Sequence, residues 1–295
     1  MRLMMMKFAF ALLCSVLLCG CNGASTPAPT PTPTPTPTPS TATVAAGTGP
    51  SAVAVNSVTN RIYVANSNCF GSSGSVTVID GATNNTTTVA TGDCPDAVAV
   101  NSVTNQIYVA NSSLNGTPSN NVTVIDGATN NTTTVAVGTS PYGVAVNPNT
   151  NEIYVANDGS NNVTVIDGAT NNTTTVAAGN NPYAVAVNPS TNQIYVLNVN
   201  GSSSGSVTMI DGATNNTTTV AVGTGVFRGM AVNPVTNQIY ITNWGGTNVT
   251  VIDGATNNTT TVAVGTGPLA VAVNSVTNQI YVANENSDNV TVITP

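Results

Sequence analysis

The stretch that decides the fold reads Thr150-Asn-Glu-Ile-Tyr-Val-Ala-Asn157, and the chain spells it six times with few changes. The six copies begin at Thr59, Thr104, Thr150, Thr191, Thr236 and Thr277. Successive starts lie 45, 46, 41, 45 and 41 residues apart. A period of this size is typical of a β-propeller with four-stranded blades, or of another stacked array.

Each repeat contains four short segments rich in valine, isoleucine and threonine. In the third repeat these segments cover residues 143–147, 152–157, 162–167 and 172–178. The connections between them are rich in Asn, Asp, Gly and Pro, which favour turns. We therefore predict an all-β domain over residues 41–295, a six-bladed β-propeller of four-stranded blades.

The two ends of the repeat array complement each other. The sixth repeat stops at Pro295 after its third segment, where the other repeats continue into a fourth. The missing segment is found at the other end, because residues 41–50 closely match residues 259–268. We predict that the N-terminal segment forms the fourth strand of the last blade, which would close the ring without an open seam.

The repeat resembles the YVTN-type β-propeller repeats of bacterial and archaeal surface proteins. The motifs that carry the resemblance are Val163-Thr-Val-Ile-Asp167, a Gly-x-x-Pro before the first segment, Val144-Ala-Val-Asn-Pro148 and Ile153-Tyr-Val-Ala-Asn157. The resemblance covers residues 41–295 and implies a propeller fold. It implies little about function, since the family includes surface-layer proteins and many members without a known activity. Related propellers often have seven blades, whereas this sequence has six repeats.

The first 20 residues have the pattern of a signal peptide. Arg2 and Lys7 precede an apolar run, residues 8–18, which is too short to span a bilayer. The run ends in Leu18-Cys19-Gly20-Cys21, which resembles the lipobox of bacterial lipoproteins. We predict that Cys21 is the lipidated first residue of the mature chain. An ordinary signal peptide followed by an incidental cysteine is the alternative.

Residues 21–40 are predicted to be a Pro/Thr-rich linker. Most of this stretch alternates proline with threonine or alanine, which favours an extended polyproline helix. Together with the lipid anchor, the linker predicts an extracytoplasmic protein attached to the bacterial cell envelope. The contact with the membrane would be made only through the anchor.

Charge composition excludes several classes of function. Without the predicted signal peptide, Arg61 and Arg228 are the only cations against 11 acidic residues, so the net charge is 2 − 11 = −9. Nucleic-acid binding needs a basic surface, which this chain lacks. There is no histidine, and the mature chain has no lysine, so Ser-His-Asp triads, imidazole metal ligands and Schiff bases are excluded. We predict a protein that is not an enzyme and holds no cofactor.

One position in the repeat varies while its neighbours hardly change. It precedes the first small residue of each first segment and holds Ser51, Asp96, Tyr142, Tyr183, Arg228 and Leu269 in turn. In a six-bladed ring, Asp96 and Arg228 would lie opposite each other at the mouth of the central channel, and the two tyrosines would be adjacent. We predict a polar small-ligand site there. Solvated rim residues without a ligand are the alternative.

Three aromatic residues lie in variable loops on the same predicted face: Phe70, Phe227 and Trp244. They predict a contact patch for a carbohydrate or a protein, or else packing over neighbouring loops. By contrast, the tyrosine that recurs in every second segment is predicted to be structural.

Aspartates and cysteines complete the set of candidate residues. An aspartate precedes glycine in five turns (Asp80, Asp126, Asp167, Asp211 and Asp253), where it is predicted to stabilise the turn and to bind no metal.

Cys69 and Cys94 lie in loops of one face, which predicts a disulfide, with two free thiols as the alternative.

These features predict a non-catalytic binding or interaction module, monomeric, for a glycan, a peptide or an envelope protein. A structural or self-assembling surface component is the second hypothesis, because outer threonine-rich strands present edges that can pair. A carboxylate-dependent hydrolase of lactonase type is the third.

Overall fold

The computed structural model describes residues 41–295 except 70–73, 113–118, 202–203, 224 and 226. The chain divides into two units after Ala42; the first is described only at residues 41 and 42, which form no strand or helix. All structure discussed below belongs to the second unit. Within the described residues, no helix is long and apolar enough to cross a membrane.

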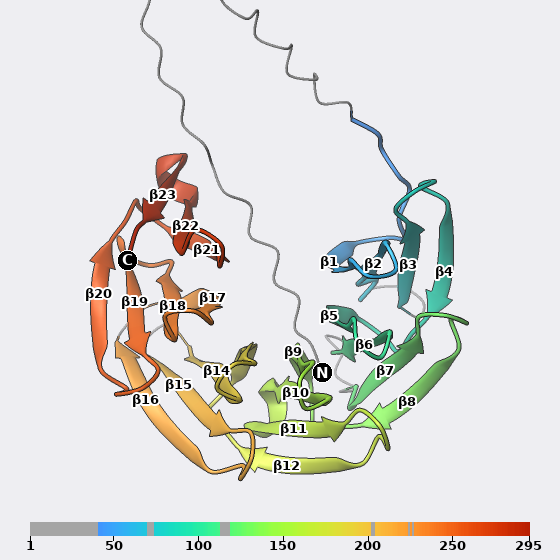
Figure 1. The fold of residues 1–295 in the computed structure, drawn as a ribbon, viewed down its shortest axis with the longest axis horizontal. Helices are drawn as coiled ribbons and strands as arrows, with labels where there is room; N and C mark the ends of the chain where they lie inside the picture. Colours follow the sequence, from blue (N-terminus) through green and yellow to red (C-terminus); the bar gives the residue numbers. More distant parts are fainter. Residues whose placement is uncertain (1–40, 70–73, 113–118, 202–203, 224, 226) are drawn as a thin grey trace, which may run out of the picture. The chain divides into compact units, whose positions relative to one another are not determined.

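The second unit consists of six antiparallel sheets in chain order (Figure 1). Sheet 1 contains β1 (Pro50–Asn56), β2 (Arg61–Asn66), β3 (Ser75–Asp80) and β4 (Thr86–Ala90). Sheet 2 contains β5 (Pro95–Asn101), β6 (Gln106–Asn111), β7 (Asn121–Asp126) and β8 (Thr132–Ala136). Sheet 3 contains β9 (Pro141–Asn147), β10 (Glu152–Asn157), β11 (Asn162–Asp167) and β12 (Thr173–Ala177), with a 3-10 helix, η1 (Asp158–Ser160), between β10 and β11.

The second half of the unit repeats this arrangement. Sheet 4 contains β13 (Pro182–Asn188), β14 (Gln193–Asn200), β15 (Ser204–Asp211) and β16 (Thr217–Gly223). Sheet 5 contains β17 (Phe227–Asn233), β18 (Gln238–Asn243), β19 (Asn248–Asp253) and β20 (Thr259–Ala263). Sheet 6 has three strands, β21 (Pro268–Asn274), β22 (Gln279–Asn284) and β23 (Asn289–Ile293), with η2 (Glu285–Ser287) between the last two.

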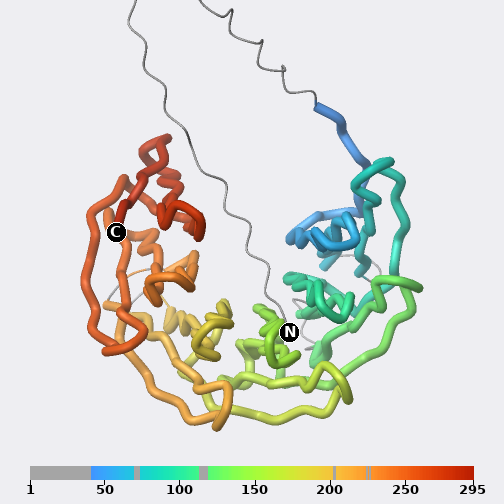
Figure 2. Tube along the Cα trace, viewed as in Figure 1, coloured from blue at the N-terminus to red at the C-terminus, as the bar shows by residue number. Residues whose placement is uncertain are grey.

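The sheets follow one another along an arc, with the first strand of each innermost and the fourth strand of sheets 1 to 5 outermost (Figures 1 and 2). Each strand pairs with the next along the chain, as in the ladder of Tyr154 with Ala145 on one side and Val165 on the other. Successive residues are apolar and buried in the second strand, as in Ile153-Tyr-Val-Ala156 of β10, and because side chains alternate between faces this run makes both faces of the sheet apolar. The predicted all-β, propeller-like fold with six blades is therefore the fold observed.

The core lies between successive sheets. At one such interface, sheet 3 contributes Tyr154, Ala156, Val163, Val165 and Val176, and sheet 4 contributes Ile194, Val196 and Ile210. The recurring tyrosine is fully buried in the second strand of sheets 1 to 4. Burying such aromatic side chains is worth several kcal/mol each, about 3–5 by truncation to alanine, which explains why the position is invariant among the repeats.

A bridge of asparagine amides also joins neighbouring sheets. The last residue of an inner strand, Asn147, donates from Nδ2 to Oδ1 of Asn192 in the next sheet (2.7 Å). Asn192 has a left-handed backbone (φ 54°), a conformation that asparagine tolerates well. The same bridge joins Asn56 to Asn105, Asn101 to Asn151, Asn188 to Asn237 and Asn233 to Asn278.

The first and last sheets each keep one face that no other described sheet covers. In sheet 6, Val290 is 59% and Val292 is 49% exposed, whereas the equivalent Val163 and Val165 of sheet 3 are 0% and 5% exposed. Val53 and Val55 of sheet 1 are also exposed. The predicted closing strand is not formed in the structure, because residues 41–47 belong to no strand and β23 has no outer partner within the described residues. Closure of the ring stays a prediction.

Candidate functional site

The variable position identified in the sequence lies in a β-bulge at the start of each inner strand. In sheet 3, Pro141 pairs with Asn157 and Gly143 pairs with Ala156, so that Tyr142 between them has no ladder partner. The register shifts at the same point in the five other sheets. A β-bulge leaves one residue without a partner across the ladder and changes the direction in which its side chain points. This explains why the position can vary while its neighbours do not.

Tyr142 and Tyr183 form a stacked pair across the boundary between sheets 3 and 4. Their ring centroids lie 4.5 Å apart at an interplanar angle of 27°. A Cβ atom on Gly143 would lie 2.7 Å from the backbone oxygen of Tyr183, so the lack of a side chain at Gly143 lets the two inner strands approach. The stack brings two predicted site residues into direct contact.

Both predicted charges act on Tyr142. Burial is the main cause that raises the pKa of the Tyr142 phenol, followed by its hydrogen bond with Tyr183. The carboxylate of Asp96 raises this pKa further, and the guanidinium of Arg228 lowers it. Tyr142 therefore stays a neutral hydrogen-bonding group at physiological pH, in the field of one acidic and one basic side chain.

Asp96 is held in place by two serines. Ser67 Oγ donates to Asp96 Oδ1 (2.9 Å), and Ser112 Oγ donates to Asp96 Oδ2. Cys69 and Cys94 form a disulfide beside this group, with their Cα atoms 4.6 Å apart. The two sulfurs and a carboxylate oxygen of Asp96 are close enough to suggest a metal site, but sulfurs bonded to each other are not thiolate ligands.

Arg228 contacts an aromatic ring. Its guanidinium carbon lies 5.7 Å from the ring centroid of Trp244, in the range of a cation–π interaction. Trp244 Nε1 in turn donates to Oε2 of Glu285 (2.6 Å), which belongs to sheet 6. Trp244 is thus part of the same inner region as the variable position, a relation that sequence spacing did not reveal.

Phe227 is not a surface contact, which corrects the prediction made from the sequence. It is 1% exposed and belongs to the apolar core around Leu197, Val207 and Met209. It occupies the position that proline holds at the start of the five other inner strands. Its ring fills space that the smaller prolines leave elsewhere. Two further predictions, the contact role of Phe70 and the lipidation of Cys21, fall on residues outside the described part of the chain.

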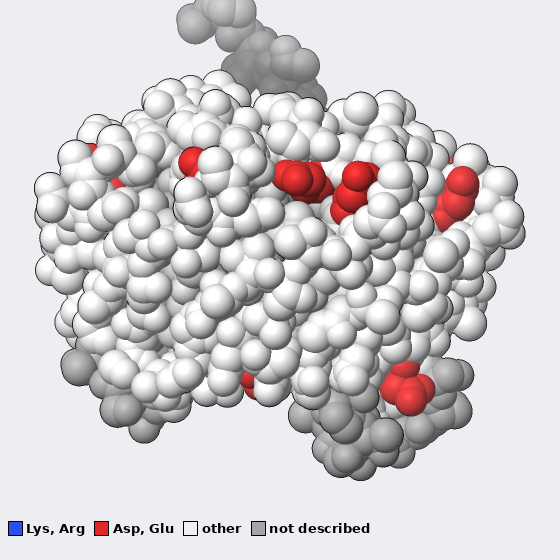
Figure 3. Space-filling view, turned by 90° about the horizontal axis from the view of Figure 1, so that it is seen from below, with Lys and Arg blue, Asp and Glu red and all other residues white. Residues whose placement is uncertain are grey.

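The turn aspartates have structural roles in the structure. Asp211, for example, accepts hydrogen bonds from the backbone N–H groups of Ala213 (2.9 Å) and Thr214 (3.0 Å), and these bonds hold the pKa of its carboxyl below the usual range. In the side view of Figure 3, acidic side chains form a row near one end of the visible face, and no described basic side chain shows there.

Sequence reasoning missed Ser67, Ser112 and Glu285, which position the predicted site residues. All three lie at loop positions that differ from one repeat to the next. They share one repeat position, the residue after the last asparagine of the second strand, which Trp244 occupies in sheet 5. The repeat comparison shows that this position varies, but variety alone does not separate a role in the site from drift.

No protein-family model matches this chain, and no curated protein matches it. Solved structures do. The hydrazine synthase of Kuenenia stuttgartiensis superposes with a TM-score of 0.54 at 21% identity, over 86% of this chain and 98% of that chain. An auxiliary nutrient binding protein from Bacteroides thetaiotaomicron gives a TM-score of 0.55 at 14% identity, over 83% and 69% of the two chains. A Bacteroides uniformis protein provisionally named as a 6-phosphogluconolactonase gives 0.64 at 14% identity, over 84% and 82%.

These neighbours are β-propeller-like proteins, and at such low identities the likeness shows the fold alone.

Proposed function

We propose that this protein is a non-catalytic binding module of the cell envelope, and that its ligand binds the bulge cluster. The bulge cluster is defined as Asp96, Tyr142, Tyr183, Arg228 and Trp244. The observation that carries the proposal is the β-bulge at the start of each inner strand, where the residue type differs from sheet to sheet while the ladder residues beyond it hardly change. Binding residues on a rigid scaffold follow this pattern.

The chemistry of the cluster suits a polar ligand with an apolar face. The stacked tyrosines offer a flat apolar surface with two phenol groups at its edge. Arg228 offers hydrogen-bond donors, and Trp244 offers a second ring. A sugar ring or a short peptide presents this combination of hydroxyl, carboxylate and C–H surfaces. The named function of one neighbour, nutrient binding, agrees with such a role.

A hydrolase of lactonase type is the second candidate, because one neighbour is provisionally named as a lactonase. Against this role, both oxygens of Asp96 already accept hydrogen bonds from serines, which leaves its carboxylate poorly placed to act as a general base. Incubation with 6-phosphogluconolactone separates the two candidates. Release of acid above the spontaneous rate, lost in Asp96→Asn, would favour the hydrolase.

Replacement of Arg228 by alanine should weaken ligand binding by roughly 1–3 kcal/mol, the usual range for a hydrogen bond to a charged group. Tyr142→Ala should have an effect of similar size, since it removes half of the stacked pair. Isothermal titration against peptidoglycan fragments and short peptides measures both changes. Leu269→Ala, at the same bulge position in sheet 6, is the matched control and should bind as the unmodified protein does. Equal affinity for all three variants would place the ligand elsewhere.

We also propose that the sheets form a closed, six-bladed propeller of YVTN type, with residues 41–46 as the outer strand of sheet 6. The exposed faces of sheets 1 and 6 support this, because each matches a face that is buried at the five other interfaces. Self-assembly through these two faces is the competing arrangement. Sedimentation at rising protein concentration distinguishes them, since only the second arrangement predicts concentration-dependent growth.

Lipid anchoring through Cys21 would hold this module outside the cytoplasm on a linker of residues 21–40. Cys21→Ser should move the protein from the membrane fraction to the soluble fraction of the producing cells, because the diacylglyceryl thioether cannot form. Immunoblotting of the two fractions measures the change. Membrane retention of the variant would contradict the lipobox assignment.

A further inference from the structure

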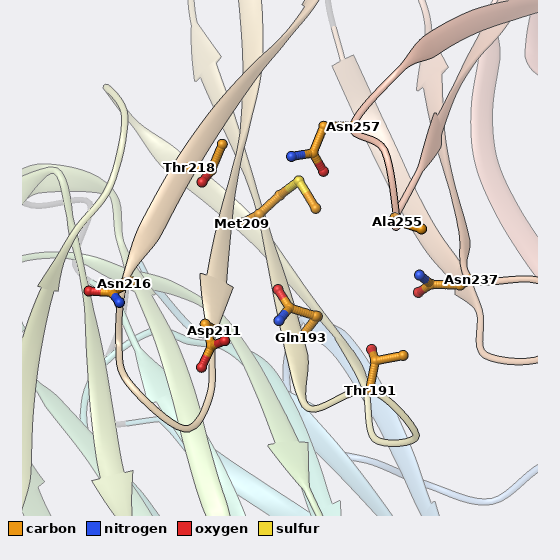
Figure 4. Close-up of a pocket in the computed structure, with 10 residues that line it drawn as sticks. Thr191, Gln193, Met209, Asp211, Asn216, Thr218, Asn237, Ala255 and Asn257 are labelled. Carbon is orange, nitrogen blue, oxygen red and sulfur yellow. The ribbon is translucent and has the colours of Figure 1, made fainter.

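A second hollow lies far from the bulge cluster along the strands, among the turns at the other ends of sheets 4 and 5. We call it the 4–5 groove (Figure 4). Its volume is about 470 Å³, within the range of small-molecule sites. Its lining comprises Thr191, Gln193, Met209, Asp211, Asn216, Thr218, Asn237, Gly254, Ala255 and Asn257.

The repeat supplies a comparison for this groove. The equivalent hollow between sheets 1 and 2 has a volume of only about 180 Å³. There, Arg61 occupies the position of Gln193, and its Nη1 donates to the backbone oxygen of Gly127 in the next sheet (2.6 Å). Gly127 is the counterpart of Gly254. The longer side chain spans the hollow between sheets 1 and 2, whereas Gln193 leaves the 4–5 groove open.

The polar groups around the 4–5 groove are amides, hydroxyls and one carboxylate. Asn257 Oδ1 is buried and accepts no hydrogen bond from the described residues. Asn130 Oδ1 in the smaller hollow is likewise buried without a donor among the described residues. The two hollows therefore share an unused acceptor, and the larger open volume distinguishes the 4–5 groove. The thioether of Met209, where sheet 1 has Val78, lies at the base of the groove; the side chain is 5% exposed and offers a small, soft apolar contact (Figure 4).

The charges and hydrogen-bonding groups of the residues that line the groove favour one class of ligand. An anion would meet the negative charge of Asp211 with no cation in the lining to offset it. A cation would need several charged oxygens, but Asp211 supplies the one carboxylate of the lining. Both backbone N–H groups that bond to this carboxylate donate to Oδ1. Amides and hydroxyls both donate and accept, as alcohol groups do. The remaining match is a neutral molecule with several hydroxyl groups and a C–H face for Met209.

We propose that the 4–5 groove is a second binding site of this protein, which takes a neutral saccharide ring. The ring would lie over Met209, with hydroxyls donating to Asn257 Oδ1 and Asp211 and accepting from Gln193 and Asn237. This site is separate from the bulge cluster and does not depend on the proposal made for that cluster.

The arginine that spans the equivalent hollow between sheets 1 and 2 suggests a substitution that would block the 4–5 groove. Gln193→Arg should let the guanidinium reach the backbone oxygen of Gly254, as Arg61 reaches that of Gly127. Saturation-transfer NMR with cellobiose, maltose and chitobiose, each at up to about 10 mM, measures binding in the weak range expected for a half-open site. We expect at least one disaccharide to bind and Gln193→Arg to weaken it about tenfold or more. The matched control is Gln106→Arg, the same change in sheet 2, which should leave binding unchanged.

A second pair of variants separates loss of a contact from loss of the fold. Asp211→Asn keeps an acceptor for the turn but removes the charge, and it should weaken disaccharide binding about fivefold, whereas Asp126→Asn in sheet 2 should not. Arg228→Ala, in the bulge cluster, should also leave this binding unchanged. The proposal is overturned if no disaccharide binds, or if Gln193→Arg and Gln106→Arg have the same effect on binding. It is also overturned if Arg228→Ala weakens disaccharide binding.

Discussion

Removal of residues 41–46 should lower the melting temperature of the globular unit by about 10 °C or more. The residues match those of β20, and the ladder of β19 with β20 gives their expected register on β23: Ala45 opposite Asn289, Val44 opposite Val290 and Thr43 opposite Thr291. The deletion would leave β23 as an open edge. It would also remove the apolar cover of Val44, whose counterpart Val176 is 5% exposed in sheet 3.

The expected size follows from the lost contacts. Burial of a valine contributes about 1.5–3 kcal/mol, and each ladder hydrogen bond about 1 kcal/mol. In a unit of this length, 1 kcal/mol corresponds to about 2–4 °C. Differential scanning calorimetry of the deletion and of a linker deletion, residues 35–40, gives the comparison. Identical melting of the two variants would show that residues 41–46 do not complete sheet 6.

Asn147→Ala should reduce the free energy of unfolding by about 3 kcal/mol, because it leaves buried polar groups without partners. Asn147 is fully buried; its Nδ2 donates to Asn192 Oδ1 (2.7 Å), and its Oδ1 accepts from the backbone N–H of Asn149 (3.1 Å). Urea unfolding followed by tyrosine and tryptophan fluorescence measures the loss.

The control for this variant is two residues further along the chain. Asn149 lies in the same turn, and its Nδ2 donates to the backbone oxygen of Pro189 at an exposed position (2.8 Å). Asn149→Ala should therefore change the free energy of unfolding by less than about 1 kcal/mol. Equal effects of the two substitutions would mean that the amide bridge does not hold the sheets together.

The sequence predicted the strands and their order well, because the repeat supplied six versions of one pattern. Turn residues and apolar segments recur at the same positions in every copy, so an accidental pattern in one copy can be recognised by comparison with the other five. It also singled out the variable position, although not the reason for its variety. A bulge depends on which residues pair across two strands, and that register is visible only in three dimensions.

Other features could not be derived from the repeat. Phe227 was expected in a loop because its neighbours differ from the other repeats, yet it starts an inner strand and packs into the core. The hydrogen-bond partners of Asp96 and Trp244 share one repeat position, the residue after the last asparagine of the second strand, and the repeat shows that this position varies but not what each residue contacts. The amide bridge was overlooked because Asn147 and Asn192 are both common turn residues, and a role in turns already explained them.

The proposed binding site requires the six inner strands to surround one central opening, so ring closure is the central claim. The most direct test is the free energy of unfolding of Asn274→Ala, in sheet 6. A closed ring places Asn274 against Asn60 of sheet 1 as Asn147 lies against Asn192, and the substitution should then cost about 3 kcal/mol, as Asn147→Ala does. In an open arc Asn274 stays exposed and bonds only to the backbone of its own turn. A loss below about 1 kcal/mol would contradict closure.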